Sequence, residues 1–259
     1  MNIIKKVFPV AILFLILGAY PLLAQKDTVK IKMTGGKAVV SLLEGSASLL
    51  KKGMTKPQAL SKGDFLTQGD RITIDVKSRL EVEMPDGSFV RFDEKTTFLL
   101  ESIAYDKKTA KKDINVNMLL GKTWAHVPKF SGSKGRFAIT TKTSVAGVRG
   151  TDFRMNVNQD YSAVLKVYEG EVAVSQRKDI DMAKAPVKLE EPTRVAGPQP
   201  VAGPHPVSME KWTYIVRSLQ QINIRPDGTA AKPFRFDIEK DLNDWVRWNQ
   251  ARNQLLRPL

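Results

Sequence analysis

Between Lys37 and Gln176 the sequence consists of short runs of β-favouring residues that glycines interrupt. Three of these places share one arrangement, in which a glycine separates two strand-like runs; the glycines are Gly45, Gly121 and Gly170. Their unequal spacing excludes a solenoid of fixed period. A glycine between two strand segments allows a sharp bend where the chain passes from one sheet to another. The pattern predicts an all-β core of bent antiparallel strands, built as a β-sandwich or an irregular β-roll.

The clearest local element is a hairpin. Apolar and charged residues alternate over residues 79–84 and again over 89–92. Between them lies the sequence PDGS at residues 85–88, in which Asp86 and Gly87 form a common turn pair. We expect each strand of this hairpin to turn one apolar face to the core and one charged face to solvent.

A second informative segment is ITTKTSVAGVRGTDFRM, residues 139–155. Small residues in its centre suggest a tight turn, and we expect Ala146, Gly147 and Gly150 to form it with positive φ. β-favouring side chains flank this turn on both sides. The bend therefore displays Arg149.

Two interpretations of Arg149 remain open. Its guanidinium could act as a fork donor that ties neighbouring carbonyls or carboxylates and fixes the bend, which we favour, or it could recognise an anionic or protein partner. With Arg149, we select Thr151, Phe153 and Trp124 as candidate binding residues.

Residues 146–153, AGVRGTDF, resemble the A-x-x-R-G-T-x-F signature of the FecR domain family, named for the ferric citrate regulator of bacterial cell-surface signalling. Further motifs similar to those of the family occur in order across residues 37–176; they are the two Gly-Asp pairs at 63–64 and 69–70 with the ITI that follows, the DGS at 86–88 and LKVYEGEV at 165–172. The resemblance implies an all-β domain. In signalling members it implies a cytoplasmic anti-sigma segment, a membrane span and a periplasmic part that responds to an outer-membrane TonB-dependent transducer.

The first residues read as a secretory signal peptide over residues 1–24. Lys5 and Lys6 precede an apolar run that extends from Val7 to Ala24. Cleavage after Ala24 is the interpretation that we favour, and an uncleaved membrane anchor is the alternative. Because the apolar run begins at Val7, we expect the chain to lack the anti-sigma segment. We therefore expect a periplasmic or otherwise exported protein of the bacterial cell envelope, with a lead-in over residues 25–36 and membrane contact only through an uncleaved signal segment.

The chain is strongly basic. It has 41 lysines and arginines against 27 acidic residues, and removal of residues 1–24 lowers the formal net charge from +14 to +12. In the envelope such a surface favours anionic wall polymers or acidic protein faces, whereas we expect no nucleic-acid partner. Solubility alone would also explain the charge. Cysteine is absent, so the chain forms no disulfide.

The composition changes after the β-domain, whose predicted limits are residues 37–176. A proline-rich linker is predicted over 177–206 and a helical extension over 207–259. Apolar residues at helical spacing predict two helices. The first contains Met209, Trp212, Ile215, Val216 and Leu219, with Ser208 as its cap; the second contains Ile238, Leu242, Trp245 and Val246, with Asp237 as its cap. We expect both helices to pack on the β-domain rather than to bind a partner through Trp212 and Trp245.

The sequence offers no catalytic set. The two histidines, His126 and His205, have no second ligand at metal-binding spacing, and no nucleophile or nucleotide motif is present. Glu81 and Glu83 are expected to share a solvent-facing side of one strand, where charge usually serves solvation. We therefore predict that the protein is not an enzyme and that it uses no cofactor and no metal.

The leading functional hypothesis is a non-catalytic FecR-domain protein that acts as a protein-interaction or sensory module in an envelope signalling, transport or assembly complex. The alternative is a module that binds peptidoglycan or an anionic glycan. It is motivated by the basic charge and by Trp124, with Lys122 and Lys129 nearby, because aromatic and basic side chains together suit acidic sugars.

Overall fold

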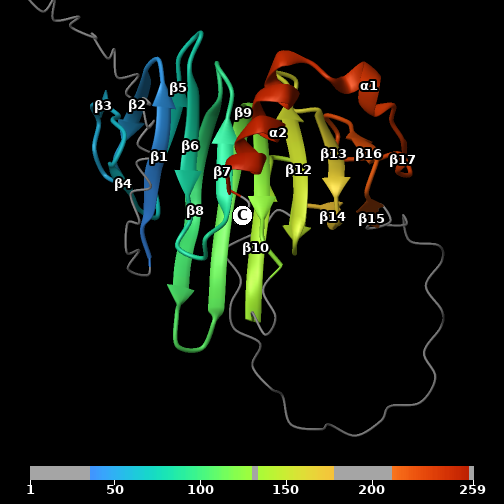
Figure 1. The fold of residues 1–259 in the computed structure, drawn as a ribbon, viewed down its shortest axis with the longest axis horizontal. Helices are drawn as coiled ribbons and strands as arrows, with labels where there is room; N and C mark the ends of the chain where they lie inside the picture. Colours follow the sequence, from blue (N-terminus) through green and yellow to red (C-terminus); the bar gives the residue numbers. More distant parts are fainter. Residues whose placement is uncertain (1–35, 130–133, 178–211, 257–259) are drawn as a thin grey trace, which may run out of the picture. The chain divides into compact units, whose positions relative to one another are not determined.

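One continuous sheet folds into two facing layers of strands. The computed structural model describes residues 36–129, 134–177 and 212–256, and seventeen strands in these ranges are joined in a single hydrogen-bonded sheet. The strands stand side by side in a row, from β1, β2 and β3 at the blue end to β15, β16 and β17 at the orange end (Figure 1). The predicted signal peptide, most of the proline-rich linker and His205 lie outside the described residues.

Neighbouring strands within each layer are antiparallel, except where β9 pairs with β10 in parallel. Layer one contains, in spatial order, β4 (Phe65–Leu66), β1 (Ala38–Glu44), β6 (Arg79–Glu83), β7 (Phe89–Phe92), the second half of β9 (Lys111–Val127), β12 (Thr151–Val157), β13 (Ala163–Glu169), β16 (Gln220–Ile224) and β17 (Phe234–Arg235). Layer two contains β3 (Gln58–Ala59), β2 (Ala47–Leu50), β5 (Arg71–Ile74), β8 (Thr97–Asp106), the first half of β9, β10 (Lys134–Thr140), β11 (Ser144–Val148), β14 (Glu171–Gln176) and β15 (Thr213–Arg217).

Each of the three glycines singled out in the sequence lies at one of the places where the chain crosses between layers. Gly45 joins β1 to β2, Gly170 joins β13 to β14, and Gly121 lies inside β9 where this strand changes partners from β8 and β10 to β7 and β12. Their φ angles are +78°, +83° and +102°, a region that residues with a Cβ atom rarely adopt. The prediction of bent strands that pass between sheets is confirmed, in the sandwich form.

Apolar side chains from both layers meet in one core. Val82 and Leu165 of layer one and Ile72 and Val172 of layer two belong to the same buried cluster. The stacked rings of Phe92 and Phe98, whose centroids lie 3.7 Å apart, connect β7 to β8 across the layers. The alternation of apolar and polar residues along each strand therefore fixes which side chains fill the interior.

The predicted hairpin is confirmed as β6 and β7. The amide of Gly87 donates to the carbonyl oxygen of Met84, and Gly87 has a φ of +79°. Asp86 accepts hydrogen bonds from the amide and hydroxyl of Ser88, and its carboxylate forms an ion pair of 2.7 Å with Lys112. The Asp-Gly pair thus closes the turn, as its sequence predicts.

The prediction of a first helix is wrong from residue 212 onward, which is the part that the structure describes. Residues 213–224 form a hairpin, with β15 paired to β14 and β16 paired to β13. Trp212, Val216 and Leu219 follow helical spacing, but residues 213–215 are β-branched or aromatic, and the hairpin completes the ladders that β14 and β13 leave open. Ser208 and Met209 lie outside the described residues.

The second predicted helix exists in two pieces, α1 (Ile238–Asp241) and α2 (Asp244–Leu256). Asp237 caps α1 as predicted, because its side chain accepts from the amides of Glu239 and Lys240. The break at Leu242 is followed by a new cap, in which the side chain of Asn243 accepts from the Val246 amide at 3.0 Å. Neither helix of the described ranges has the length and apolar character needed to span a membrane.

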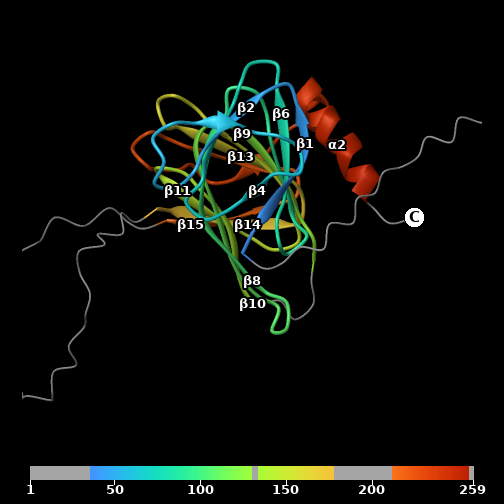
Figure 2. The same ribbon diagram turned by 90° about the vertical axis from the view of Figure 1, so that its left-hand side faces the viewer.

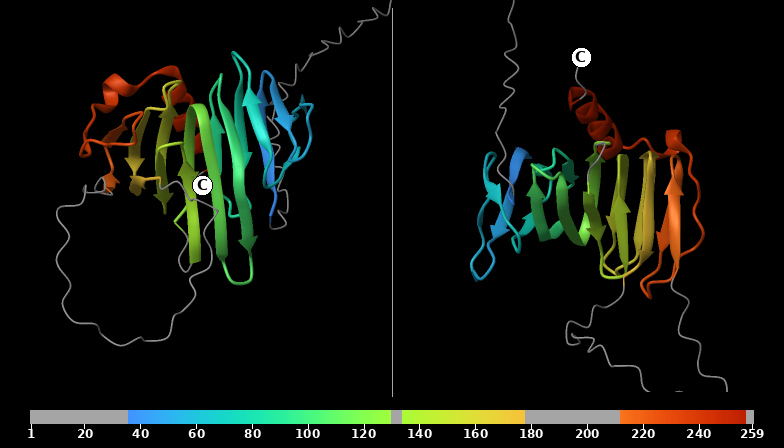
Figure 3. Two further views of the ribbon diagram at one scale, coloured as in Figure 1. Left: turned by 180° about the vertical axis from the view of Figure 1, so that it is seen from behind. Right: turned by 90° about the horizontal axis from the view of Figure 1, so that it is seen from below.

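Both helices belong to the outer side of layer one. Viewed along the row of strands, α2 lies outside the two layers on one side (Figure 2), and from behind it is hidden beyond the strands (Figure 3). The expectation of packing on the β-domain is confirmed for the second predicted helix by the contacts described below, whereas the described residues of the first form strands.

We predict that Gly121→Ala lowers the free energy of unfolding by about 2–4 kcal/mol, because its Cβ would lie 2.5 Å from the Cα of Thr96 at a positive φ. Gly147→Ala is the matched control, since its Cβ would meet nothing closer than 3.7 Å. Urea denaturation measures both. Equal midpoints for the two variants would contradict a requirement for glycine at the crossing.

Candidate interaction surface

A row of charged and aromatic side chains crosses the outer face of layer one. Glu81, Arg91, Trp124, Arg154 and Lys166 are successive cross-strand neighbours on β6, β7, β9, β12 and β13. Side chains at such positions lie on the same face of a sheet. This row is the surface on which α1 and α2 pack.

Glu81 connects the sheet to α2. Its carboxylate accepts from Arg91 Nε at 2.6 Å and from Arg252 Nη2 at 2.6 Å, and Arg91 Nη1 donates to Asn253 Oδ1 at 2.6 Å. Glu81 and Arg91 are 1% and 0% exposed. The expectation that Glu81 faces solvent is therefore wrong, because α2 covers this part of the sheet.

Two glutamates on β6 have pKa values shifted in opposite directions. Burial alone would raise the pKa of Glu81, but hydrogen bonds and charges from Arg252 and Arg91 outweigh it and lower this pKa below 4.5. Burial raises the pKa of Glu83, and the nearby charge of Glu81 raises it further. Glu83 is half-buried, so its expected solvent exposure is only partly correct.

Asp241 attaches α1 to the same row. Its carboxylate accepts a hydrogen bond from Arg154, one of 2.8 Å from Lys166 and one of 2.5 Å from the Tyr168 hydroxyl. Burial raises the pKa of Tyr168, and its bond to Asp241 adds to the effect. Two cations and one phenol thus hold the first turn after Asp237 against β12 and β13.

Trp124 lies beneath the helices and is 1% exposed. Its ring stacks on Tyr168 with centroids 4.4 Å apart, and it shares a buried cluster with Trp245 and Val246 of α2. A sugar or a protein partner cannot reach this ring while the helices are in place. The Trp212 side chain is also bound within the domain, since its indole N–H donates to the carbonyl oxygen of Gly228 at 2.8 Å.

His126 has a structural environment. Its Nδ1 lies 2.5 Å from Asp152 Oδ1, and the other oxygen of Asp152 accepts from Asn253 Nδ2 at 2.8 Å. Asp152 thereby connects β9, β12 and α2. In the described part of the chain, no three His, Asp or Glu residues converge in a way that could hold a metal ion.

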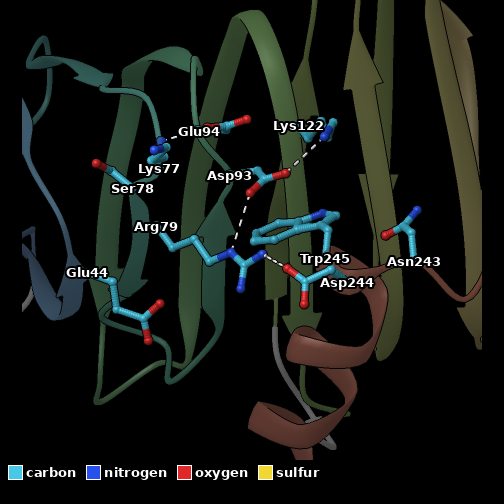
Figure 4. Close-up of a pocket in the computed structure, with 10 residues that line it drawn as sticks. All are labelled: Glu44, Lys77, Ser78, Arg79, Asp93, Glu94, Lys122, Asn243, Asp244 and Trp245. Atoms are coloured by element: carbon cyan, nitrogen blue, oxygen red, sulfur yellow. Dashed lines mark hydrogen bonds and ion pairs between the residues drawn. The ribbon is translucent and has the colours of Figure 1, made fainter.

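A cavity of about 570 Å³ lies where α2 begins (Figure 4). At its centre the Arg79 guanidinium donates to Asp93 and Asp244 and lies over the rings of Trp245 and Trp248. Asp93 also accepts from Lys122 Nζ at 3.0 Å. Arg79 and Lys122 balance Asp93 and Asp244, so this part of the cavity is a joint between the helix and the sheet.

The segment with the family-like signature lies elsewhere. Ala146 and Gly147 belong to β11 and pair with Ile139 and Ala138, so their predicted turn with positive φ is wrong. Only Gly150 has a positive φ, of +64°. The alternating side chains of this segment keep it in the ladder between β10 and β14, and the bend is confined to residues 149–150.

Thr151 and Phe153 face inward. The hydroxyl of Thr151 donates to the carbonyl oxygen of Glu171 at 3.1 Å, and Phe153 is fully buried in the core. Both residues therefore anchor the signature segment and cannot contact a partner directly. Arg149, between these anchors and β11, is exposed.

Arg149 lines a second cavity of about 510 Å³, which we call the basic cleft. It is lined by Lys129, Arg149, Gly150, Gly170, Glu171, Arg217 and Ser218. Glu171 and Arg217 are cross-strand partners on β14 and β15. Glu171 is the carboxylate among the described lining residues, and it forms no ion pair with any of the three cations. Among the described residues, no carbonyl or carboxylate accepts a hydrogen bond from Arg149, so its interpretation as a fork donor stays a prediction.

The floor of the basic cleft is bare backbone. A Cβ on Gly170 would overlap the carbonyl oxygen of Gly150, and a Cβ on Gly150 would overlap the side chain of Lys129. These glycines let the two crossing segments approach closely. The sequence analysis predicted a helix around Arg217 and grouped Lys129 with Trp124. It therefore did not predict that these two cations lie beside Arg149. The strand-forming run around Ile215 was the signal that could have located Arg217.

Comparison with known proteins identifies one segment. Residues 70–173 match the family model described as FecR protein. Residues 70–173 are therefore similar to a FecR domain. This domain includes Arg91, Trp124 and Arg149, whereas Arg217 and α2 lie beyond the matched range. No curated protein matches the chain significantly.

Two solved structures, both titled crystal structures of "a putative anti-sigma factor from Parabacteroides distasonis ATCC 8503", are similar to the chain. They were determined at 1.65 and 2.50 Å resolution, and each shares 17% identity with it at a TM-score of 0.42. The match covers 66% of this chain and 61% of theirs, which is less than two thirds of their length.

Substitutions of Glu81 and Glu83 test how α2 is attached to the sheet. We predict that Glu81→Gln lowers the free energy of unfolding at pH 7 by about 3–5 kcal/mol, because Arg91 loses its buried counterion. Ionised Glu81 stabilises the fold above pH 4.5, and this contribution is lost as the pH falls through its lowered pKa. The deficit of the variant should therefore shrink at pH 3.

Glu83→Gln is the control. Because its raised pKa means that ionised Glu83 opposes folding, this variant should be neutral or slightly stabilised at pH 7. Urea unfolding at both pH values measures the two variants. A deficit for Glu81→Gln that is equally large at pH 3 would contradict the ionic role.

Proposed function

We propose that this chain is a non-catalytic protein-interaction or sensory module of the bacterial cell envelope, and that the FecR domain presents its binding surface. The family match to residues 70–173 supports a role in signalling. The N-terminal residues 1–24, with two lysines before an apolar run, support export. The partner that we propose is another envelope protein, and membrane contact is restricted to the N-terminal segment if it is retained.

One observation carries this proposal. The signature segment is anchored by Thr151 and Phe153, yet its arginine is exposed in the basic cleft beside Lys129 and Arg217. A guanidinium held on a short bend between anchored strands loses little conformational freedom when it binds. Such an arginine suits recognition of a carboxylate on a partner protein.

The burial of Trp124 weighs against the glycan-binding alternative. That hypothesis joined Trp124 to Lys122 and Lys129, but the ring is covered by α2, and the two lysines line different cavities. Among the residues that the structure describes, no aromatic side chain lines the basic cleft. We therefore do not retain a stacking site for an anionic sugar.

Photo-crosslinking in living bacterial cells tests the proposal. We expect a photoreactive residue in place of Arg149 to give a discrete protein adduct that mass spectrometry identifies. The control is the same residue in place of Arg71, which is an exposed arginine on β5, outside the basic cleft. Identical adduct patterns at the two positions, or none at Arg149, would count against a partner at the signature loop.

A further inference from the structure

The strand β15 has one edge that no described strand covers. Within the described residues its only ladder partner is β14, and it closes layer two at the orange end of the row (Figure 1). An edge strand presents unpaired backbone N–H and C=O groups that can pair with another polypeptide. Short edges are commonly protected by proline, lysine or a bulge, and the sequence TYIVR of β15 contains none of these.

The hydrogen-bond register identifies the free groups. The amide of Gln176 donates to the carbonyl oxygen of Trp212, so alternate residues from Trp212 onward direct their backbone groups to β14. Thr213, Ile215 and Arg217 therefore direct theirs to the open edge. The amide of Arg217 is satisfied by the Gln220 side chain at 3.0 Å. Within the described ranges the amides of Thr213 and Ile215 have no acceptor, and Ile215 is 41% exposed.

The same edge leads to the basic cleft. Arg217 is the last residue of β15, and Arg149 and Lys129 line the cleft with it, against a single acidic residue, Glu171. Glu171 forms no ion pair with these cations and could balance only one of the three charges, so a ligand with several carboxylates would supply further counterions. A backbone edge selects a polypeptide, and the cations select an acidic one.

We propose that an extended acidic segment of a partner protein adds a strand to the edge of β15 and places its carboxylates against Arg217, Arg149 and Lys129. This inference rests on the proposed interaction function and names the chemistry of the partner. Main-chain hydrogen bonds to Thr213 and Ile215 supply the pairing, and the cleft supplies the preference for acidic side chains. Lipids and nucleic acids lack the peptide groups that this mode requires.

A synthetic peptide tests both parts. The probe is a fluorescent eight-residue peptide in which glutamate alternates with valine, and its binding to the full chain is measured by fluorescence anisotropy. Two companion peptides keep the length, one with lysine in place of glutamate and one methylated on alternate backbone amides. We expect the acidic peptide to bind at least about tenfold more tightly than either companion, and more weakly at high salt.

Variants locate the contact. The double variant Arg149→Glu and Arg217→Glu should weaken binding of the acidic peptide at least about tenfold, whereas Arg71→Glu should not change it. Ile215→Pro removes one free edge amide but no bond to β14 and should also weaken binding. Circular dichroism checks the fold of each variant, and the methylated peptide tests the edge independently of Ile215→Pro.

Several outcomes would overturn the inference. Equal binding of the methylated peptide would exclude strand addition, and equal binding of the lysine peptide would exclude charge selection. Equal competition by a single-stranded oligonucleotide would reduce the cleft to an unspecific anion patch. A discrete adduct at Arg149 without binding of any peptide would overturn the inference and leave the proposed function in place.

Discussion

Three of the layer crossings, each made at a glycine, are the constraint on which the rest of the structure depends. Gly45, Gly121 and Gly170 adopt positive φ where neighbouring backbone or side chains leave no room for a Cβ atom. One sheet can therefore fold back on itself and bury its own apolar face. The basic cleft is a product of the same constraint, because Gly170 brings the β13–β14 crossing against Gly150 and forms its floor.

The C-terminal helices are held mainly by polar contacts. Glu81 and Arg91 of the sheet are almost fully buried beneath α2, and Arg154 meets Asp241 of α1. Burying ion pairs costs desolvation, so such pairs add little net stability but penalise any displaced arrangement strongly. Arg91 Nη2 and Arg154 Nε are buried without an acceptor in the described residues, which adds to this cost. The network therefore specifies where the helices lie more than how strongly they bind.

The sequence predicted those features that depend on neighbouring residues. The Asp86–Gly87 turn, the layer crossings and the Asp237 cap each result from local backbone chemistry. It failed where distant segments decide the outcome. Glu81 is covered by a helix that contacts it from residue 252, and residues 213–217 become a strand because β14 offers an unpaired edge. Alternation and helical spacing cannot report such contacts.

The candidate site shows the same division between local and distant causes. The AGVRGTDF segment indicated that Arg149 lies at a bend, but Lys129 and Arg217 join it only through the crossings and the final hairpin. Each of the three cations projects from a different part of the chain onto a rigid end of the sandwich. Glu171 offsets only one of these three positive charges, so the fold holds the cations together at an electrostatic cost. A binding role explains such an arrangement better than solubility does, because scattered lysines would provide solubility without converging on one cleft.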